Sequence, residues 1–150
     1  MSESRAIRPI TLADEAAWRP LWRDYLRHHQ ADLPDAVIAT TFARLTSGGE
    51  IEPRGFLAWQ GQQAVGLVHF LFHRHCWRIE NVCYIQDLFT APEARGRGTG
   101  RALISAVYQA ADAEGAPAVH WLTAETNARA RALYDRIGRK TPFIRYNRVI

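Results

Sequence analysis

The sequence predicts one α/β (α+β) domain in which helices flank a mixed β-sheet. Its length of 150 residues suits a single domain with a sizeable core. Its composition, 47% hydrophobic and 23% charged, is ordinary for a globular protein and argues against disorder. Segments with helical and strand periods follow one another in the order β-α-α-β-β-β-α-β-α-β. We therefore expect residues 1–150 to form a single domain without repeats or linkers.

The first part of the chain contains signals for a strand and two helices. Residues 6–10 have the pattern of a short strand, and Thr11 with Asp14 resembles a capping box. Asp32 and Pro34 suit the start of a second helix. Both helices have an apolar stripe at helical spacing, formed by Trp18, Leu21, Trp22, Tyr25 and Leu26 in the first and by Val37, Ile38, Phe42 and Leu45 in the second.

A hairpin follows the helices. Residues 55–60 and 64–72 read as two strands joined by a Gly-Gln-Gln turn. His69, His73 and His75 alternate onto one face of the second strand. A metal site is one interpretation, but no carboxylate or cysteine lies at a metal-ligand spacing. We therefore prefer a solvent-exposed sheet face or an interface for these histidines, and we expect no metal.

The central strand of the predicted sheet covers residues 82–91 and ends at Pro92. Both of its faces are mostly apolar, as in a strand covered on both sides. Gln86 and Asp87 interrupt the apolar pattern in the middle of the strand. Simple alternation places Val82, Tyr84, Leu88 and Thr90 on one face and Cys83, Ile85, Phe89 and Ala91 on the other.

The remaining elements alternate between helix and strand. A helix follows the glycines after Pro92 and ends at Gly115. Residues 118–123 read as a strand, and Asn127 can cap a helix that Gly138 stops. Residues 143–149 read as a last strand.

Charge and cysteine content limit the classes of partner. The net charge of +4 reflects 18 arginines against a single lysine, Lys140, and permits an anionic ligand. The arginines are spread along the chain, so specific nucleic-acid binding is not expected. No apolar run is long enough for a membrane span and no signal peptide is seen, which makes the cytoplasm the default location. Cys76 and Cys83 are expected to be reduced thiols, although pairing across a hairpin is the alternative.

A glycine-rich loop lies between the central strand and the next helix. Gly96, Gly98 and Gly100 occupy alternate positions among arginines. Such a loop gathers free N–H groups at the positive end of a helix dipole, which favours an anion and above all a phosphate. It lacks the Gly-Lys-Ser/Thr ending of a nucleotide P-loop, and its position does not suit a Rossmann fingerprint. The alternative is a tight turn with solvated arginines.

A second group of residues shares one face of the helix that starts at Asn127. Asn127, Ala130, Arg131 and Tyr134 lie at positions i, i+3, i+4 and i+7. This face is small and polar and ends in a phenol. The alternative is that Tyr134 is a half-buried packing residue.

The two groups together resemble the GCN5-related N-acetyltransferase (GNAT) superfamily. Arg95-x-x-Gly98-x-Gly100 is similar to its acetyl-CoA motif, and Asn127-x-x-Ala130-x-x-x-Tyr134 to its second helix motif. The segments around them look closest to the Hpa2-like histone/polyamine acetyltransferase group. The resemblance implies a GNAT fold with a mostly antiparallel sheet, and an acetyltransferase that uses acetyl-CoA and no metal.

The resemblance also implies roles for individual residues in binding acetyl-CoA. Main-chain groups of the central strand would hold the pantetheine arm, the loop would wrap the pyrophosphate, and the second helix would flank the cofactor. The residues concerned are Leu88, Phe89, Thr90, Arg95, Gly96, Arg97, Gly98, Thr99, Gly100, Arg101, Asn127 and Ala130.

Catalysis requires an acid for the leaving thiolate and a route for the proton of the amine. Tyr134 is the candidate acid, since a thiol has a pKa of about 8.5 and a tyrosine one of about 10. Related polyamine enzymes commonly have Glu-Asp in the central strand, whereas this chain has Gln86-Asp87. Asp87 is therefore the candidate base, with Glu80 through water or no single residue as alternatives. An equally open alternative is that the Asp87 carboxylate only pairs with a nearby arginine or backbone group and has no catalytic role.

The acceptor is expected to be a primary amine of a polyamine, a small molecule, a peptide or a protein lysine. Trp22 and Tyr25 either line its cleft or pack in the core, and Gln86 and Glu125 complete the candidate acceptor site. Direct transfer is expected, because neither cysteine belongs to the two motifs. The alternative function is a non-catalytic CoA-binding module, which the glutamine at position 86 favours. We also expect a homodimer.

Overall fold

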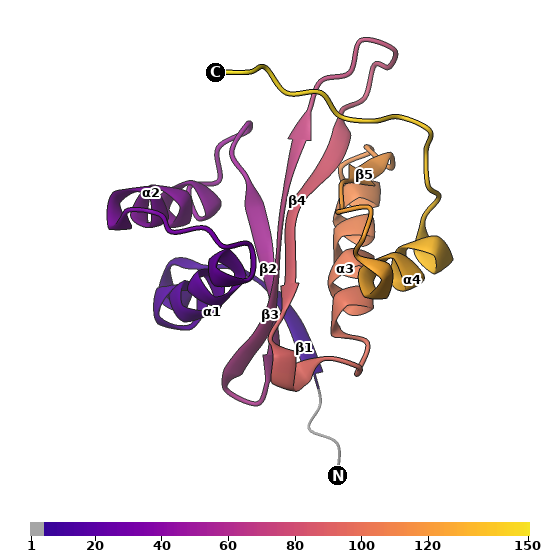
Figure 1. Cartoon of the computed structure of the whole chain (residues 1–150). Coiled ribbons are helices and arrows are strands. Elements are labelled where there is room, and N and C mark those ends of the chain that lie inside the picture. Colours follow the sequence, from indigo (N-terminus) through magenta and orange to yellow (C-terminus); the bar gives the residue numbers. More distant parts are fainter. Residues whose placement is uncertain (1–4) are drawn as a thin grey trace.

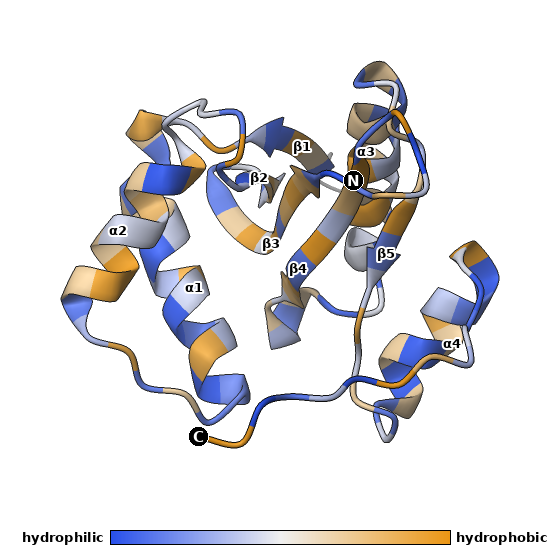
Figure 2. Ribbon diagram, turned by 90° about the horizontal axis from the view of Figure 1, so that it is seen from above, coloured by the Kyte–Doolittle hydropathy of each residue, from blue (hydrophilic) through white to orange (hydrophobic). Residues whose placement is uncertain are grey.

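A computed structural model describes residues 5–150 and contains one five-stranded sheet with helices on both faces (Figure 1). Helices α1 and α2 cover one face and α3 and α4 the other, and Figure 2 shows the same layers from above. The elements are β1 (Arg5–Pro9), the 3₁₀ turn η1 (Leu12–Asp14), α1 (Glu15–His28), α2 (Asp35–Leu45), β2 (Arg54–Gln60), β3 (Gln63–His73), β4 (Val82–Thr90), the 3₁₀ turn η2 (Pro92–Ala94), α3 (Thr99–Ala113), β5 (Val119–Trp121) and α4 (Ala128–Ile137).

The sheet is mixed, as the sequence predicts. Its strand order is β1-β2-β3-β4-β5, and the first four strands are antiparallel neighbours. Only β5 runs parallel to its neighbour β4, because the crossover through α3 brings the chain back to the same end of the sheet. The predicted α/β fold with a mostly antiparallel sheet is therefore confirmed.

Two apolar clusters hold the layers together. One lies between the sheet and the helices α1 and α2, and it includes Trp18, Phe42 and Leu67. The other lies between the sheet and α3, and it includes Phe70 and Leu103. The sheet is buried on both faces, which explains the nearly continuous apolar pattern of β3 and β4.

Most predicted helix boundaries agree with the structure. The N–H of Thr11 donates to the Asp14 carboxylate at 2.8 Å, so the predicted capping bond is present at η1, just before α1. Gly115 ends α3 in the left-handed region, with φ 68°. In the second helix, Val37 was expected in the buried stripe but is 44% exposed, because α2 buries only Ile38, Phe42 and Leu45.

The predicted last strand over residues 143–149 is wrong. The chain after α4 runs to the C-terminus without joining a strand (Figure 1). A strand needs the backbone groups of a neighbour, and residues 143–149 pair with no described strand. β5 is also shorter than predicted, since only residues 119–121 pair with β4.

The predicted faces of β4 are also wrong beyond Ile85. His69 of β3 pairs with Asp87, but the next residue, Phe70, pairs with Ile85, so Gln86 is an extra residue in β4. Such a β-bulge reverses the alternation of side chains after it. As a result Cys83 and Ile85 pack with the α3 cluster, whereas Phe89 and Ala91 belong to the α1–α2 cluster.

Within residues 5–150, none of the helices has both the length and the apolarity that crossing a bilayer requires.

Candidate active site

The site begins where β4 and β5 part. The two strands pair only from Cys83 to Ile85 of β4. Beyond the bulge at Gln86, β4 has β3 on one side but no β5 ladder on the other. Main-chain N–H and C=O groups of residues 86–90 that point toward β5 are thus available to a ligand. The predicted pantetheine-binding residues Leu88 and Thr90 lie on this edge, while the Phe89 side chain is buried in the α1–α2 cluster.

The glycine-rich loop leads from this edge into α3. Gly96 and Gly98 have φ angles of 80° and 77°, in the left-handed region that favours glycine. Gly98 is also the N-cap of α3. The N–H groups of Thr99, Gly100 and Arg101 lie in the first turn of the helix, where no intrahelical acceptor exists. The loop therefore has the geometry of an anion site.

Two arginines tie this loop to the sheet. Arg95 donates from Nε to the Thr90 carbonyl at 3.2 Å, and it is half-buried. Arg5 of β1 donates from Nη1 to the Arg97 carbonyl at 2.6 Å. Arg5 is not among the residues predicted from the sequence, since a contact across 92 residues has no local signal. The loop thus gains a cation from the far end of the chain.

Helix α4 lies beside the start of α3 and carries the second predicted group. A Cβ on Gly100 would be 3.6 Å from Cδ2 of Leu133, so the two helices are in contact there. The Asn127 side chain accepts from the N–H of Ala130 at 3.3 Å and caps α4, as predicted. Its oxygen is therefore already used within the helix. Tyr134 is half-buried, with its ring edge against Trp121.

The predicted base has two bonded partners. The Tyr25 hydroxyl donates to Oδ1 of Asp87 at 2.8 Å, and Nδ1 of His69 lies 3.0 Å from Oδ2. Asp87 is 15% exposed, so one side of it faces solvent. The carboxylate is thus both partnered and accessible. Glu80, the alternative base, precedes β4 and pairs with Arg78 at 3.6 Å.

The interpretation of His69 as a solvent-exposed residue is wrong. His69 is 3% exposed, and its Nε2 lies 3.0 Å from Nε1 of Trp18, which is fully buried. Helix α1 covers this face of β3, which excludes water there. His73 is instead half-buried at the end of β3, 3.2 Å from His120. The histidines therefore have separate environments.

The four predicted acceptor residues also differ in environment. Trp22 is buried at 6% exposure and stacks on Tyr25, which is half-buried. Gln86 and Glu125 are exposed. Tyr25 is hydrogen-bonded to Asp87, and Gln86 precedes Asp87 in the chain. Trp22 packs against the ring of Tyr25.

Burial sets the protonation of the two tyrosines. Burial, and then the nearby Asp87 carboxylate, raises the pKa of Tyr25 far above its ordinary value. Burial also raises the pKa of Tyr134. Both phenols are proton donors at neutral pH.

The two cysteines are free. Cys76 is exposed in the loop between β3 and β4, and Cys83 is buried in the α3 cluster. Burial raises the pKa of the Cys83 thiol to about 12, which keeps it un-ionised at neutral pH. A buried, protonated thiol is a poor nucleophile, in line with direct transfer.

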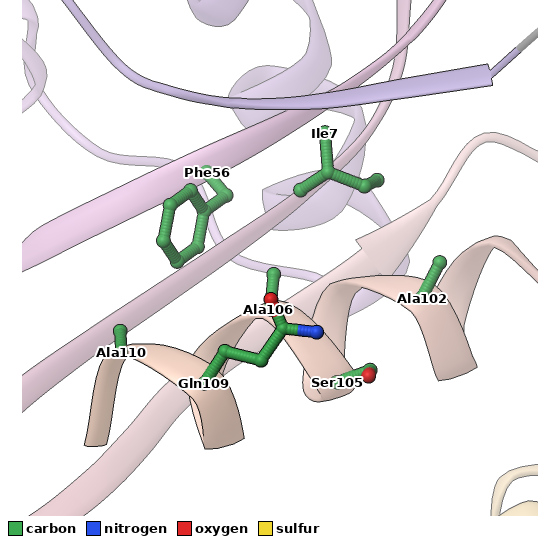
Figure 3. Close-up of a pocket in the computed structure, with 7 residues that line it drawn as sticks. All are labelled: Ile7, Phe56, Ala102, Ser105, Ala106, Gln109 and Ala110. Atoms are coloured by element: carbon green, nitrogen blue, oxygen red, sulfur yellow. The ribbon is translucent and has the colours of Figure 1, made fainter. Parts of the chain in front are cut away.

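A separate hollow of about 480 Å³ lies between α3 and the first two strands (Figure 3). Its lining includes Ile7, Phe56 and Gln109. It shares no residue with the predicted site and holds no charged side chain. Its apolar walls do not suit a pyrophosphate or an amine, so we assign it no part in the chemistry.

Comparison with known proteins decides the family. The family model described as "Acetyltransferase (GNAT) family" matches residues 15–138. The chain belongs to the GNAT family. The predicted resemblance is thereby confirmed, and this GNAT protein is an N-acetyltransferase.

Individual relatives agree with the family. The D-amino-acid N-acetyltransferase HPA3 of Saccharomyces cerevisiae is 38% identical over 144 residues, covering 95% of this GNAT chain and 89% of the yeast protein. The thialysine N-epsilon-acetyltransferase of Bos taurus is 32% identical over 79 residues, covering 53% of this chain and 46% of the bovine protein. The solved aminoglycoside N-acetyltransferase AAC(6')-Iy in complex with CoA has a TM-score of 0.83 at 18% identity, covering 97% of this chain and 95% of that chain. This last likeness is one of fold.

Proposed function

We propose that this GNAT protein transfers the acetyl group of acetyl-CoA directly to a primary amine of a small molecule. The proposal rests on three features: the open edge of β4, the partnered Asp87 carboxylate in that strand, and the glycine-rich loop that leads from it into α3, with α4 against the start of α3. We further propose that residues 1–150 form one acetyltransferase domain.

The loop has the properties that a pyrophosphate requires. No atom outside the local chain lies within 4 Å of a Cβ built on Gly96, so the backbone there is open to a ligand. The free N–H groups at the start of α3 and the exposed side chains of Arg97 and Arg101 would bind the negative charge. Leu88, Phe89 and Thr90 would supply main-chain partners to the pantetheine arm, and Ala130 would leave room for it.

Two side chains of the proposed site would move protons. Tyr134 would donate a proton to the departing thiolate, because its raised pKa keeps the phenol protonated. Asp87 would accept a hydrogen bond from the incoming ammonium and help it to lose its proton. A main-chain N–H of residues 88–90 would stabilise the negative charge that develops on the carbonyl oxygen.

A small amine fits the proposed site better than a polycation. Gln86 brings no charge, so Asp87 and the exposed Glu125 supply the negative charge of the acceptor site. The yeast relative is named for its activity toward D-amino acids, which are small molecules with an α-amine beside a carboxylate. Aromatic Tyr25, stacked on Trp22, offers a surface for a compact side chain.

The test is an acceptor screen with detection of free thiol. We expect release of CoA with at least one amine from a panel of D-amino acids, L-amino acids, thialysine, spermidine and a lysine peptide. Tyr134→Phe is expected to lower kcat about 100-fold with little change in KM, as for loss of general acid catalysis. Binding of CoA in a calorimeter without transfer to any amine would favour the non-catalytic alternative, and an unchanged kcat would remove Tyr134 from its role.

We also propose a homodimer, with the chain after α4 as the contact between copies. Phe143 and Tyr146 in this segment are 85% and 87% exposed. Five large apolar residues lie exposed between positions 143 and 150, and such a patch marks a protein contact. A second copy is the proposed occupant, since the open edge of β5 can pair with a segment of strand pattern. Light scattering should give twice the chain mass for the full chain and one chain mass after truncation at position 141; a monomeric full chain would refute the dimer.

A cytoplasmic location belongs to the same proposal. Its support is the exposed free thiol of Cys76, which is typical of a reducing compartment. Fractionation of cells expressing a tagged chain tests it, and recovery in a membrane or secreted fraction would contradict it.

A further inference from the structure

A chain of three hydrogen bonds joins α1, β3 and β4 behind the proposed acceptor site. Nε1 of Trp18 lies 3.0 Å from Nε2 of His69. Nδ1 of His69 lies 3.0 Å from Oδ2 of Asp87, and the Tyr25 hydroxyl lies 2.8 Å from Oδ1. Each oxygen of the carboxylate thus has one protein partner.

The chemistry of the indole decides the tautomer of the histidine. An indole N–H can only donate a hydrogen bond, so Nε2 of His69 must accept and cannot bear a proton. The proton of the neutral ring is then on Nδ1, which donates to Asp87. A second proton on Nε2 would point at the Trp18 N–H. Trp18 cannot turn away, because it is fully buried and packs against Phe42 with ring centroids 5.2 Å apart.

The His69 ring is enclosed by residues from three elements. From α1 the ring meets Trp18 and Trp22. From β2 it meets Gly55, where an added Cβ would be 3.1 Å from Cδ2 of the ring. Asp87 on β4 is the ionisable group hydrogen-bonded to the ring, and Tyr25 bonds to the other oxygen of the same carboxylate.

The bulge in β4 is what brings the carboxylate to this partner. His69 pairs across the sheet with Asp87, and Gln86 is the extra residue just before it. Without that extra residue, the side chain at position 87 would lie on the same face as Ile85, under α3. With it, Asp87 faces α1, where Tyr25 and His69 fix both oxygens.

We propose that His69 is a positioning residue: held in its Nδ1–H tautomer by Trp18, it orients the Asp87 carboxylate toward the acceptor amine and takes no part in proton relay. This inference rests on the proposed function for the role of Asp87. The amine proton passes to Asp87 or to water and never to the imidazole, whose one proton stays on Nδ1. The free lone pairs of the carboxylate, on its solvent-facing side, are then directed at the acceptor.

Two variants separate this role from a structural one. His69→Asn keeps an N–H at the place of Nδ1, whereas His69→Leu has no donor there, and both remove the acceptor for Trp18. Loss of a partner that orients a functional ligand typically costs about 10- to 100-fold in activity, so we expect that loss in kcat for His69→Leu. His69→Asn should recover most of it, although both variants melt at a similar, lower temperature. Equal kcat values for the two variants, or a kcat for His69→Leu equal to that of the unmodified protein, would overturn the proposal.

Nuclear magnetic resonance of the ¹⁵N-labelled full chain tests the tautomer without an activity assay. The His69 ring should show the Nδ1–H tautomer, with Nε2 as the acceptor of the Trp18 N–H. In Trp18→Phe the Nε2–H tautomer should also appear, since Nε2 then has no donor. An Nε2–H tautomer in the unmodified protein would refute the assignment. A protein that acetylates no amine would refute the proposed function instead, while the spectra would still decide the state of His69.

Discussion

Gly66→Ala should displace the start of α3 and weaken binding of acetyl-CoA. Gly66 lies in β3 directly beneath this helix. A Cβ there would be 3.0 Å from Cγ2 of Thr99, 3.1 Å from Cδ1 of Leu103 and 3.1 Å from the Phe89 carbonyl oxygen. These neighbours must give by a few tenths of an ångström. Overpacking of this kind costs about 1–3 kcal/mol, and we expect about 2 kcal/mol of lost unfolding free energy.

The displacement would reach the anion site because Thr99 is the first residue of α3. If about 1 kcal/mol of the strain appears as lost binding, KM for acetyl-CoA rises roughly 5-fold. The assay is thiol release at saturating amine over a range of acetyl-CoA concentrations. Unfolding in urea measures the loss of stability.

Gly115→Ala provides the matched control. Gly115 has a φ of 68° at the far end of α3, and a Cβ there meets nothing within 4 Å. The left-handed backbone costs about 1–2 kcal/mol for alanine, so stability falls by a similar amount without movement of the loop. The reasoning is refuted if KM for acetyl-CoA rises equally in both variants, or if Gly66→Ala is as stable as the unmodified protein.

Three further predictions concern stability. The pKa of Tyr25 is raised in the folded protein, so its contribution to stability is complete below about pH 10 and is lost above that pH at about 1.4 kcal/mol per pH unit. Tyr25→Phe should therefore reduce the fall of the unfolding free energy with pH, measured by urea unfolding above about pH 10. An unchanged slope would contradict the burial of this phenol. Partial burial, and then His73 and His75 nearby, lowers the pKa of His120, so stability should fall as the pH drops below about 6.5. The loss should be small because the residue keeps much of its exposure to solvent. The melting temperature of His120→Asn should be less sensitive to pH between about 5 and 7, and equal sensitivity would refute the assignment. Tyr108→Phe removes the 2.8 Å hydrogen bond from the Tyr108 hydroxyl to the carbonyl of Ile137 at the end of α4, and should lower the unfolding free energy by about 1 kcal/mol; no loss would mean that this bond is exchanged for water at no cost.

Local patterns correctly predicted the glycine-rich turn before α3 and the start of α4. A glycine that needs a positive φ, such as Gly98, and a helix cap such as Asn127 depend on a few neighbouring residues, so the sequence contains their whole signal. The helical stripe of α1 is similar, since Trp18, Leu21 and Leu26 are buried as predicted. The roles assigned to these residues in binding and catalysis stay predictions.

Long-range contacts produced the errors. Simple alternation in β4 fails because Gln86 is an extra residue, and only pairing with β3 shows it. His69 looked exposed because its cover, Trp18, comes from a helix 51 residues earlier. The cation Arg5 reaches the loop through a similarly distant contact. Residues 143–149 have a strand pattern but pair with none of the strands within residues 5–150, and a pattern alone supplies no hydrogen-bonding partner.

The sequence by itself determined the class of fold, the family and the glycine-rich turn before α3, because turn chemistry and side-chain periodicity depend on short stretches of chain. The tertiary structure alone decided where the Asp87 carboxylate points and what holds it. That direction depends on the bulge at Gln86 and on the register of β3 against β4, which brings His69 opposite Asp87. A register shift of one residue moves a side chain to the other face of a sheet, and only the packed sheet selects the register.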